Sequence, residues 1–279
     1  MRLEGKPIAE SIKVRIKEKA QQLNRQPVLL TVSVAPNEST LTYIRSQEKQ
    51  AKAQGIAYRH LNFEKEITTE GLLAEIERIN RDAEIDAVLL SHPLPKHIDE
   101  LRLLTALSPE KDVEGRGPVN LGRLAYEKAF LYPCTAEAVM AFIDHYHIPI
   151  QGEQVAIVGR STTIGKPLSW MLLEKARNAT PIVCHTKTKD IPEIIASSKV
   201  VVVATGVPGS LSLSGIPKGA FVIDVGINVV DGKVVGDVSL DPALENERQI
   251  SVTPTPGGVG PVTSLLLMEH AYICALGSK

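Results

Sequence analysis

The sequence predicts an α/β fold in which helices cover parallel sheets. Short apolar runs alternate with amphipathic segments along almost the whole chain, which is the pattern of repeated strand–helix units. Polar or glycine-rich loops follow several of these runs, at the ends of strands where open α/β sheets place their ligands. The chain has 279 residues, enough for one large domain or two smaller ones.

Composition narrows the class of protein. Hydrophobic residues make up 43% and charged residues 23% of the chain, and the formal net charge is −1. A nearly neutral chain has no general attraction to nucleic acid or to anionic membranes. The three cysteines include no C-x-x-C pair, which fits reduced thiols. The first twenty residues are charged throughout, and no apolar run approaches the roughly 20 residues of a membrane span. We therefore expect a cytoplasmic protein with no nucleic-acid, membrane or metal partner.

The first half of the chain is expected to alternate helices and strands. Helical spacing of apolar residues, cap residues and buried apolar runs define the elements. In order, they are a helix at 6–23, a strand at 27–34, a helix capped by Ser39 or Thr40 and ending at Gly55, a strand at 56–63, a helix starting at Thr68 or Thr69, a strand at 86–90 and a helix at 99–107. Glycine, proline and charge in residues 108–118 predict a loop.

The second half repeats the alternation. A helix starting at Pro133-Cys134-Thr135 lies near the first domain boundary. The elements after it are strands at 155–158, 181–184, 200–204 and 221–225, and helices after Pro167, at 191–197 and at 262–276. The segment 154–167 is an apolar strand, a loop bounded by Gly159 and Gly165, and a helix start, as in phosphate-binding βα units. Ser161 stands where a regular G-x-G-x-x-G has its second glycine, so an ordinary βα turn remains an alternative.

Several motifs then point to one family. In order, they are KDVEG, YPCT, GRSTTIGKP, CHTKT, IDVGIN, GDV and TPTPGGVGP. With these, the chain resembles the bifunctional methylenetetrahydrofolate dehydrogenase/cyclohydrolase family. The resemblance implies two α/β domains flanking a cleft, with a folate-binding catalytic domain at 1–142 plus 262–279 and a Rossmann-type NADP-binding domain at 143–261. It also implies a homodimer that oxidises 5,10-methylenetetrahydrofolate to the methenyl form and hydrolyses that to 10-formyltetrahydrofolate.

The resemblance assigns the cofactor site. The implied NADP-binding residues are Gly159, Arg160, Ser161, Thr162, Ile164, Gly165, His185, Thr186, Thr205, Gly206 and Ile227. Arg160, with Thr186 and Lys187, would receive the 2′-phosphate. The CHTKT strand end carries no carboxylate, which favours NADP over NAD. Taken alone, Arg160 has a solvated loop arginine as its alternative interpretation.

The folate side departs from the family pattern. The family carries Tyr-x-x-x-Lys on its second helix, and here Tyr43 is followed four residues later by Gln47. Gln-Leu-Pro at the end of the third strand is replaced by Ser91-His92-Pro93, and the second acid of Lys-Asp-Val-Asp-Gly is Glu114. The implied catalytic positions are Tyr43, Gln47, Ser91 and Glu114. The implied substrate-binding residues are Tyr43, Ser91, His92, Pro93, Glu114, Pro256, Gly257 and Gly258.

Three functional hypotheses follow from these departures. Glutamine has neither charge nor a titratable proton, so a dehydrogenase with weak or absent cyclohydrolase activity is the first. The second is a fully bifunctional enzyme in which Gln47 with a water, or His92, does the work of the lysine. The third is a silent relative that binds NADP or a pterin without turnover.

Overall fold

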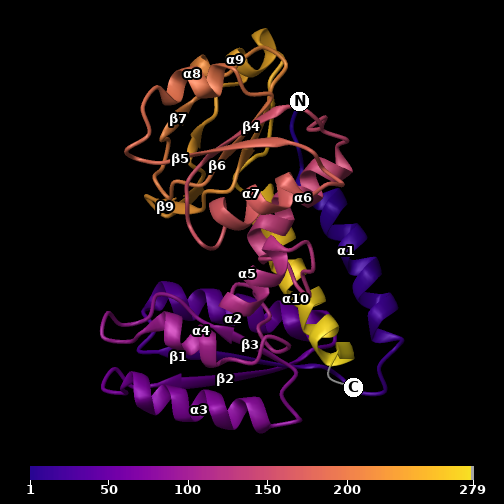
Figure 1. The fold of residues 1–279 in the computed structure, drawn as a ribbon, viewed down its shortest axis with the longest axis vertical. Coiled ribbons are helices and arrows are strands. Elements are labelled where there is room, and N and C mark those ends of the chain that lie inside the picture. Colours follow the sequence, from indigo (N-terminus) through magenta and orange to yellow (C-terminus); the bar gives the residue numbers. More distant parts are fainter. Residues whose placement is uncertain (278–279) are drawn as a thin grey trace. The chain divides into compact units, whose positions relative to one another are not determined.

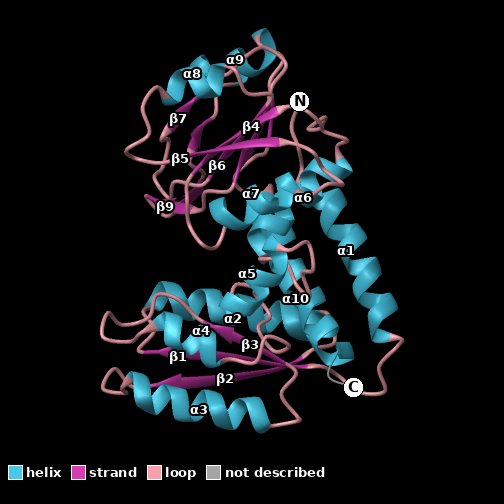
Figure 2. Cartoon of the chain, in the orientation of Figure 1, coloured by secondary structure: helices cyan, strands magenta, loops and turns pink. Residues whose placement is uncertain are grey.

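The computed structural model describes residues 1–277 and confirms the α/β architecture with parallel sheets (Figures 1 and 2). The chain forms two compact units. Of the described residues, the three-stranded unit comprises 11–132 and 264–277, and the five-stranded unit comprises 1–10 and 133–263. Each unit has a parallel sheet of its own.

The observed division differs from the expected domains at both ends. Residues 1–10 belong with the five-stranded unit because Leu3 N donates to Val252 O at 2.9 Å and Gly5 N donates to Gly257 O at 2.8 Å. Residues 133–142 also belong there because helix α6 (Cys134–His145) packs against α7 (Gly165–Leu173).

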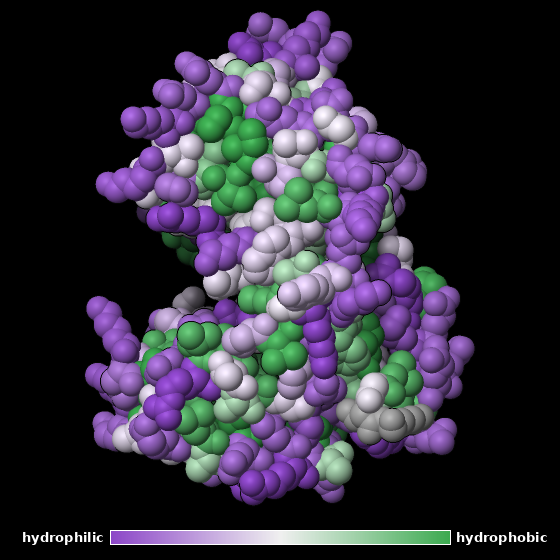
Figure 3. All heavy atoms as spheres, in the orientation of Figure 1, coloured by the Kyte–Doolittle hydropathy of each residue, from purple (hydrophilic) through white to green (hydrophobic). Residues whose placement is uncertain are grey.

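The three-stranded unit has the strand order β2 (Ala57–Phe63), β1 (Val28–Val34), β3 (Ala87–Leu90), all parallel. One face of β1 packs against α3 (Thr69–Arg81) and α4 (Glu100–Ala106) in a single apolar core. Hydrophilic side chains cover the outer side of α3 (Figure 3), as the amphipathic pattern predicts. The remaining helices with residues in this unit are α1 (Gly5–Ala20), α2 (Glu38–Ala53), α5 (Pro118–Ala125) and α10 (Val259–Gly277).

Helix α10 corrects one expectation. By length and composition it could cross a membrane, although no apolar run of that size was expected, and it extends beyond 262–276. The polar residues Glu269 and His270 interrupt its apolar sequence. Glu269 is paired with Arg15 at 2.6 Å, and His270 Nδ1 lies 2.9 Å from Val113 O. In its most apolar 18-residue window, 67% is buried, and Glu269 and His270 both have partners, which is the pattern of a core helix.

The five-stranded unit has the strand order β12 (Ser251–Val252), β8 (Phe221–Asp224), β6 (Val200–Val203), β4 (Gln154–Val158), β5 (Thr180–Cys184). All pairs are parallel. Because β4 has β5 on one side and β6 on the other, the chain reverses its direction of winding there, and a doubly wound sheet binds ligands at this point. Helices α8 (Ile191–Ala196) and α9 (Pro242–Glu247) complete the unit together with α6 and α7.

Several local features differ from the sequence-based expectations. Asn37, rather than Ser39 or Thr40, caps α2, because its Oδ1 accepts from Thr40 N at 2.8 Å. Helix α7 begins at Gly165 and includes Pro167, since proline is tolerated in a first turn. The unpredicted elements are α5, α9, β12, the 3-10 turn Leu213–Gly215, the pair β7 (Leu211–Ser212) and β11 (Val238–Ser239), and the hairpin β9 (Asn228–Val230) and β10 (Lys233–Val235).

Candidate active site

The glycine loop of the five-stranded unit connects β4 to α7. Gly159 has a φ of +141°, and a Cβ on it would lie 2.3 Å from Ala204 O. A Cβ on Gly165 would lie 2.0 Å from Gly159 O. Both positions therefore require glycine, and the backbone packs as closely as a phosphate-binding βα turn demands.

Side chains within the loop fix the start of α7. Ser161 Oγ accepts from Ile164 N at 3.1 Å, and Ser161 O accepts from Lys166 N at 3.0 Å. Arg160 and Thr162 are exposed beside this helix N-terminus. The loop thus presents a cation and a helix N-terminus to solvent, which suits an anionic ligand.

The loop after β5 is next to the glycine loop. Gly159 N donates to Cys184 O at 2.9 Å, so the two strand ends are adjacent. His185 N donates to Thr188 Oγ1 at 2.9 Å, which closes residues 185–188 into a turn and leaves Thr186 exposed. A carboxylate-free strand end therefore lies beside Arg160, as the expected 2′-phosphate site requires.

A buried carboxylate that sequence reasoning missed organises the ends of β6 and β8. Asp237 Oδ2 accepts from Thr205 N at 2.6 Å and from Gly206 N at 2.8 Å, while its Oδ1 accepts from Asn228 Nδ2 at 2.8 Å. Asp237 itself is held by Asp224, whose Oδ1 accepts from Asp237 N at 3.1 Å. Burial raises the pKa of Asp224, opposed by backbone N–H donors. The motif GDV was the only sequence signal for this network.

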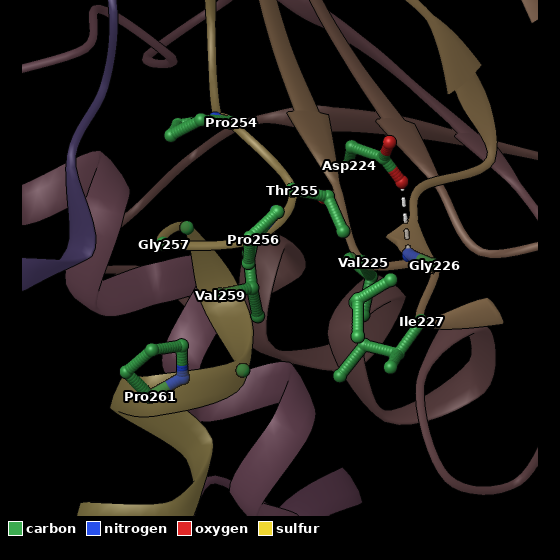
Figure 4. Close-up of a pocket in the computed structure, with 13 residues that line it drawn as sticks. Asp224, Val225, Gly226, Ile227, Pro254, Thr255, Pro256, Gly257, Val259 and Pro261 are labelled. Carbon is green, nitrogen blue, oxygen red and sulfur yellow. Dashed lines mark hydrogen bonds between the residues drawn. The ribbon is translucent and has the colours of Figure 1, made fainter. Parts of the chain in front are cut away.

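The predicted residues Ile227, Pro256, Gly257 and Gly258 line one small cavity of about 140 Å³. It lies at the end of β8 and the start of α10, and prolines, glycines and aliphatic side chains form its walls (Figure 4). Figure 4 also shows the Asp224 carboxylate accepting from Gly226 N, at 2.9 Å. A rigid, apolar wall of this kind suits contact with a flat ring.

In the three-stranded unit, Tyr43 and Gln47 differ sharply in exposure. Tyr43 is 52% exposed, whereas Gln47 is only 4% exposed. Among the residues that the structure describes, neither side-chain amide atom of Gln47 has a hydrogen-bond partner. A buried, unsatisfied amide costs about 1–3 kcal/mol, so something other than stability accounts for this residue.

The end of β3 lies beside the loop at 108–118. Ser91 is buried and its N donates to Val32 O at 2.8 Å, and the His92–Pro93 peptide bond is cis. Lys111 O accepts from Val88 N at 2.7 Å, which fixes the loop against β3. This contact places Glu114 close to His92.

Arg116, which sequence reasoning missed, joins these groups into a cluster of four residues. Its Nε donates to Glu114 Oε2 at 2.9 Å, and its Nη2 donates to Glu100 Oε1 at 2.8 Å. Nη2 also donates to Nε2 of His92. We call His92, Glu100, Glu114 and Arg116 the Arg116 cluster. In the sequence, the cluster was indicated only by the position of Arg116 two residues after Glu114.

The cluster shifts two pKa values in opposite directions. Burial raises the pKa of Glu114 to about 7; Arg116 opposes this shift, and Asp112 and Glu100 add to it. Burial, followed by Arg116, lowers the pKa of His92 to about 4. Because a guanidinium can only donate, His92 accepts through Nε2 as a neutral imidazole. A histidine in this state is a poor acid or base near pH 7.

These observations define a dinucleotide-binding α/β protein with a second α/β unit, and comparison with known proteins gives the family. The family "Tetrahydrofolate dehydrogenase/cyclohydrolase, NAD(P)-binding domain" matches residues 133–278, and the catalytic domain of the same family matches residues 3–114. The chain belongs to the tetrahydrofolate dehydrogenase/cyclohydrolase family, which confirms the resemblance found in the sequence.

Relatives cover the whole chain. The bifunctional protein FolD of Thermosipho melanesiensis is 44% identical over 270 residues, covering 97% of this chain and 96% of the relative. The bifunctional dehydrogenase/cyclohydrolase of Thermoplasma acidophilum matches with a TM-score of 0.90 and 36% identity, covering 100% of this chain and 99% of the other. The Trypanosoma brucei enzyme, solved with NADP and an inhibitor, matches with a TM-score of 0.91 and 32% identity, covering 100% and 98%.

Proposed function

We propose that this protein oxidises 5,10-methylenetetrahydrofolate to 5,10-methenyltetrahydrofolate in one-carbon metabolism, with NADP as the hydride acceptor, and that its cyclohydrolase activity is weak or absent. The reaction class follows from the family. One observation carries the finer claim: Gln47 stands in the place of the family lysine, buried and with both amide atoms unpartnered.

The cofactor assignment uses the loops at the strand ends of the five-stranded unit. Gly159, Ser161 and Gly165 would hold the phosphates through the backbone and the α7 N-terminus, while Arg160 and Thr186 would contact the 2′-phosphate. Thr162, Ile164 and His185 would complete that part of the site, and Thr205, Gly206 and Ile227 would face the nicotinamide. The bound NADP supplies the ring that takes the hydride, and the protein contributes position.

Substrate contacts are assigned to Tyr43, Ser91, His92, Pro93 and Glu114 in the three-stranded unit, and to Pro256, Gly257 and Gly258 in the five-stranded unit. Hydride transfer requires mainly that the two rings be held in position, because the substrate nitrogen supplies the electron pair. Hydrolysis of the methenyl group benefits from a charged donor near the attacked carbon. Gln47 offers a donor without charge, and His92 is neutral with a pKa near 4.

Two assays test the proposal. With methylenetetrahydrofolate and NADP, we expect NADPH to form, and to form more slowly with NAD. With methenyltetrahydrofolate alone, we expect hydrolysis close to its spontaneous rate. Gln47→Lys should raise that rate by about 100-fold, and Gln50→Lys, on the same helix, is the matched control.

Each assay has an outcome that contradicts the proposal. Rapid hydrolysis by the unmodified protein would establish the fully bifunctional enzyme, as the names of its FolD relatives suggest. Absence of NADPH formation, with NADP or a pterin still bound, would establish the silent relative.

We also propose a cytoplasmic homodimer. The hairpin β9–β10 supports self-association because it is a two-stranded sheet with open edges that exposes Val229 by 70% and Val234 by 42%. Light scattering after size-exclusion chromatography should give a molar mass twice that of the chain. Val229→Lys should reduce the measured mass to that of a single chain. A monomeric parent protein would contradict the dimer.

A further inference from the structure

Arg116 occupies an unusual place in the three-stranded unit. Its side chain is only 10% exposed, and it contacts three separate segments: Glu114 in its own loop, His92 after β3 and Glu100 at the start of α4. An arginine buried to this extent needs partners, and the two carboxylates provide them.

The backbone on both sides of Arg116 is fixed, so its side chain is held in place. Gly115 has a φ of +65°, and a Cβ on it would lie 2.8 Å from Tyr132 O. Gly117 N donates to Asp112 Oδ2 at 2.7 Å, and Asp112 also accepts from Asn120 Nδ2 at 3.0 Å. The guanidinium is therefore directed at Glu114 before any ligand binds.

The charges around Glu114 make this arginine necessary. Two other carboxylates, Asp112 and Glu100, act on Glu114 and favour its protonated form, and Arg116 is the cation that opposes them. His92 adds no positive charge, since its pKa is about 4. Among the described residues, the influences on the pKa of Glu114 that remain without Arg116 are burial and the like charges of Asp112 and Glu100.

The bonding of Glu114 also leaves one oxygen available. Among the residues that the structure describes, the hydrogen bond from Arg116 Nε goes to Oε2. Oε1 is then the oxygen that can accept from the N–H groups of a bound pterin.

We infer that Arg116 is a positioning residue of the folate pocket, which orients the Glu114 carboxylate for the substrate and supplies a positive charge beside it. This inference rests on the proposed function in so far as Glu114 contacts the pterin. Arg116 itself acts through Glu114 and not on the reacting atoms.

The kinetic test compares Arg116→Gln and Arg116→Lys with the parent protein. Arg116→Gln should raise the KM for methylenetetrahydrofolate by about 10-fold and change the KM for NADP little. Ionised Glu114 is the active form, so activity falls as the pH drops through its pKa. Removing the cation raises that pKa, and the acidic limb of kcat/KM should move up by about one pH unit. Arg116→Lys keeps the positive charge, so its acidic limb of kcat/KM should match that of the parent protein. Its KM for methylenetetrahydrofolate should lie between those of the parent protein and Arg116→Gln.

A matched control separates this role from simple stability. Arg123→Gln removes a cation that pairs with Glu110 in the same loop, at 3.3 Å, and should leave both KM and the pH profile unchanged. Carbon-13 NMR of labelled glutamate carboxyls, with Glu114→Gln for assignment, measures the titration of Glu114 without any substrate.

The outcomes are distinguishable. If the parent protein forms no NADPH, the proposed function is refuted. If the Arg116→Gln substitution nevertheless raises the pKa of Glu114 above its value in the parent protein, the positioning role stands. An active parent protein whose folate KM, pH limb and Glu114 titration do not respond to Arg116→Gln would overturn the inference and keep the proposed function.

Discussion

The glycine loop of the five-stranded unit and the Arg116 cluster of the three-stranded unit are held in place by different kinds of interaction. The glycine loop depends on backbone: two glycines at close approach, a helix N-terminus and adjacent strand ends. The Arg116 cluster depends on four side chains from three segments. Steric exclusion sets the geometry of the glycine loop, and charge pairing sets that of the Arg116 cluster. We therefore expect a substitution in the glycine loop to abolish binding abruptly, and the properties of the Arg116 cluster to change gradually with pH.

The largest expected effect is at Gly165. Gly165→Val places a side chain against Gly159 O, where even a Cβ would lie at 2.0 Å. Overpacking of this severity should cost about 3 kcal/mol or more of stability and abolish NADP binding. Thermal unfolding and NADP titration measure both effects.

The control for this change is Gly122→Ala, in α5, where a Cβ would meet nothing within 4 Å. Alanine there should stabilise by about 0.5–1 kcal/mol. If Gly165→Val bound NADP normally, the backbone account of the glycine loop would be wrong.

A smaller effect is expected at Gln47. Gln47→Leu removes a buried amide that has no partner among the described residues, so the free energy of unfolding should rise by about 1 kcal/mol. Dehydrogenase kcat/KM should fall at the same time, because the amide is then absent from the folate side. Denaturant unfolding and NADPH formation give the two values. A loss of stability would mean that Gln47 is satisfied in the folded protein.

The smallest effect is a pH dependence of stability from Glu114. Its folded pKa, about 7, is above the usual value of 4.5, so the folded state binds the proton more tightly than the unfolded state. The protonated carboxyl of Glu114 therefore contributes stability to the folded state. This contribution is complete below pH 4.5 and is lost as pH rises through 7. Glu114→Gln should therefore have a higher Tm than the parent protein at pH 8, by about 2–4 °C, and little advantage at pH 5. Calorimetry at both pH values tests this, and equal differences would contradict it.

Sequence alone predicted the strand–turn–helix structure of the glycine loop, for a physical reason. Gly159, Ser161 and Gly165 act within one strand–turn–helix segment, so their spacing carries the geometry. The parallel strands were likewise found from apolar runs, since each run is buried as a unit. Short elements such as β7 and β11 were missed, because two residues carry no periodicity.

His92 and Glu114 were expected on the folate side, but Arg116 and Glu100 were missed because their pairing is tertiary. Arg116 and Glu114 are two residues apart, but the partners Glu100 and His92 come from segments whose proximity depends on how the 108–118 loop docks on β3. The start of α10 was misplaced for another reason. Gly260 and Pro261 suggest a loop, yet a first helical turn accepts both residues.

Asp237 has a consequence for motion in the five-stranded unit. Thr205 and Gly206 follow β6 in a loop, and Gly206 is exposed, so their amides would ordinarily exchange with solvent quickly. Both amides instead donate to one oxygen of a fully buried carboxylate, whose other oxygen holds Asn228. The loop at Thr205 and Gly206 can therefore open only by breaking both bonds to this carboxylate oxygen. Hydrogen–deuterium exchange should therefore release the amides of Thr205 and Gly206 slowly and at a common rate.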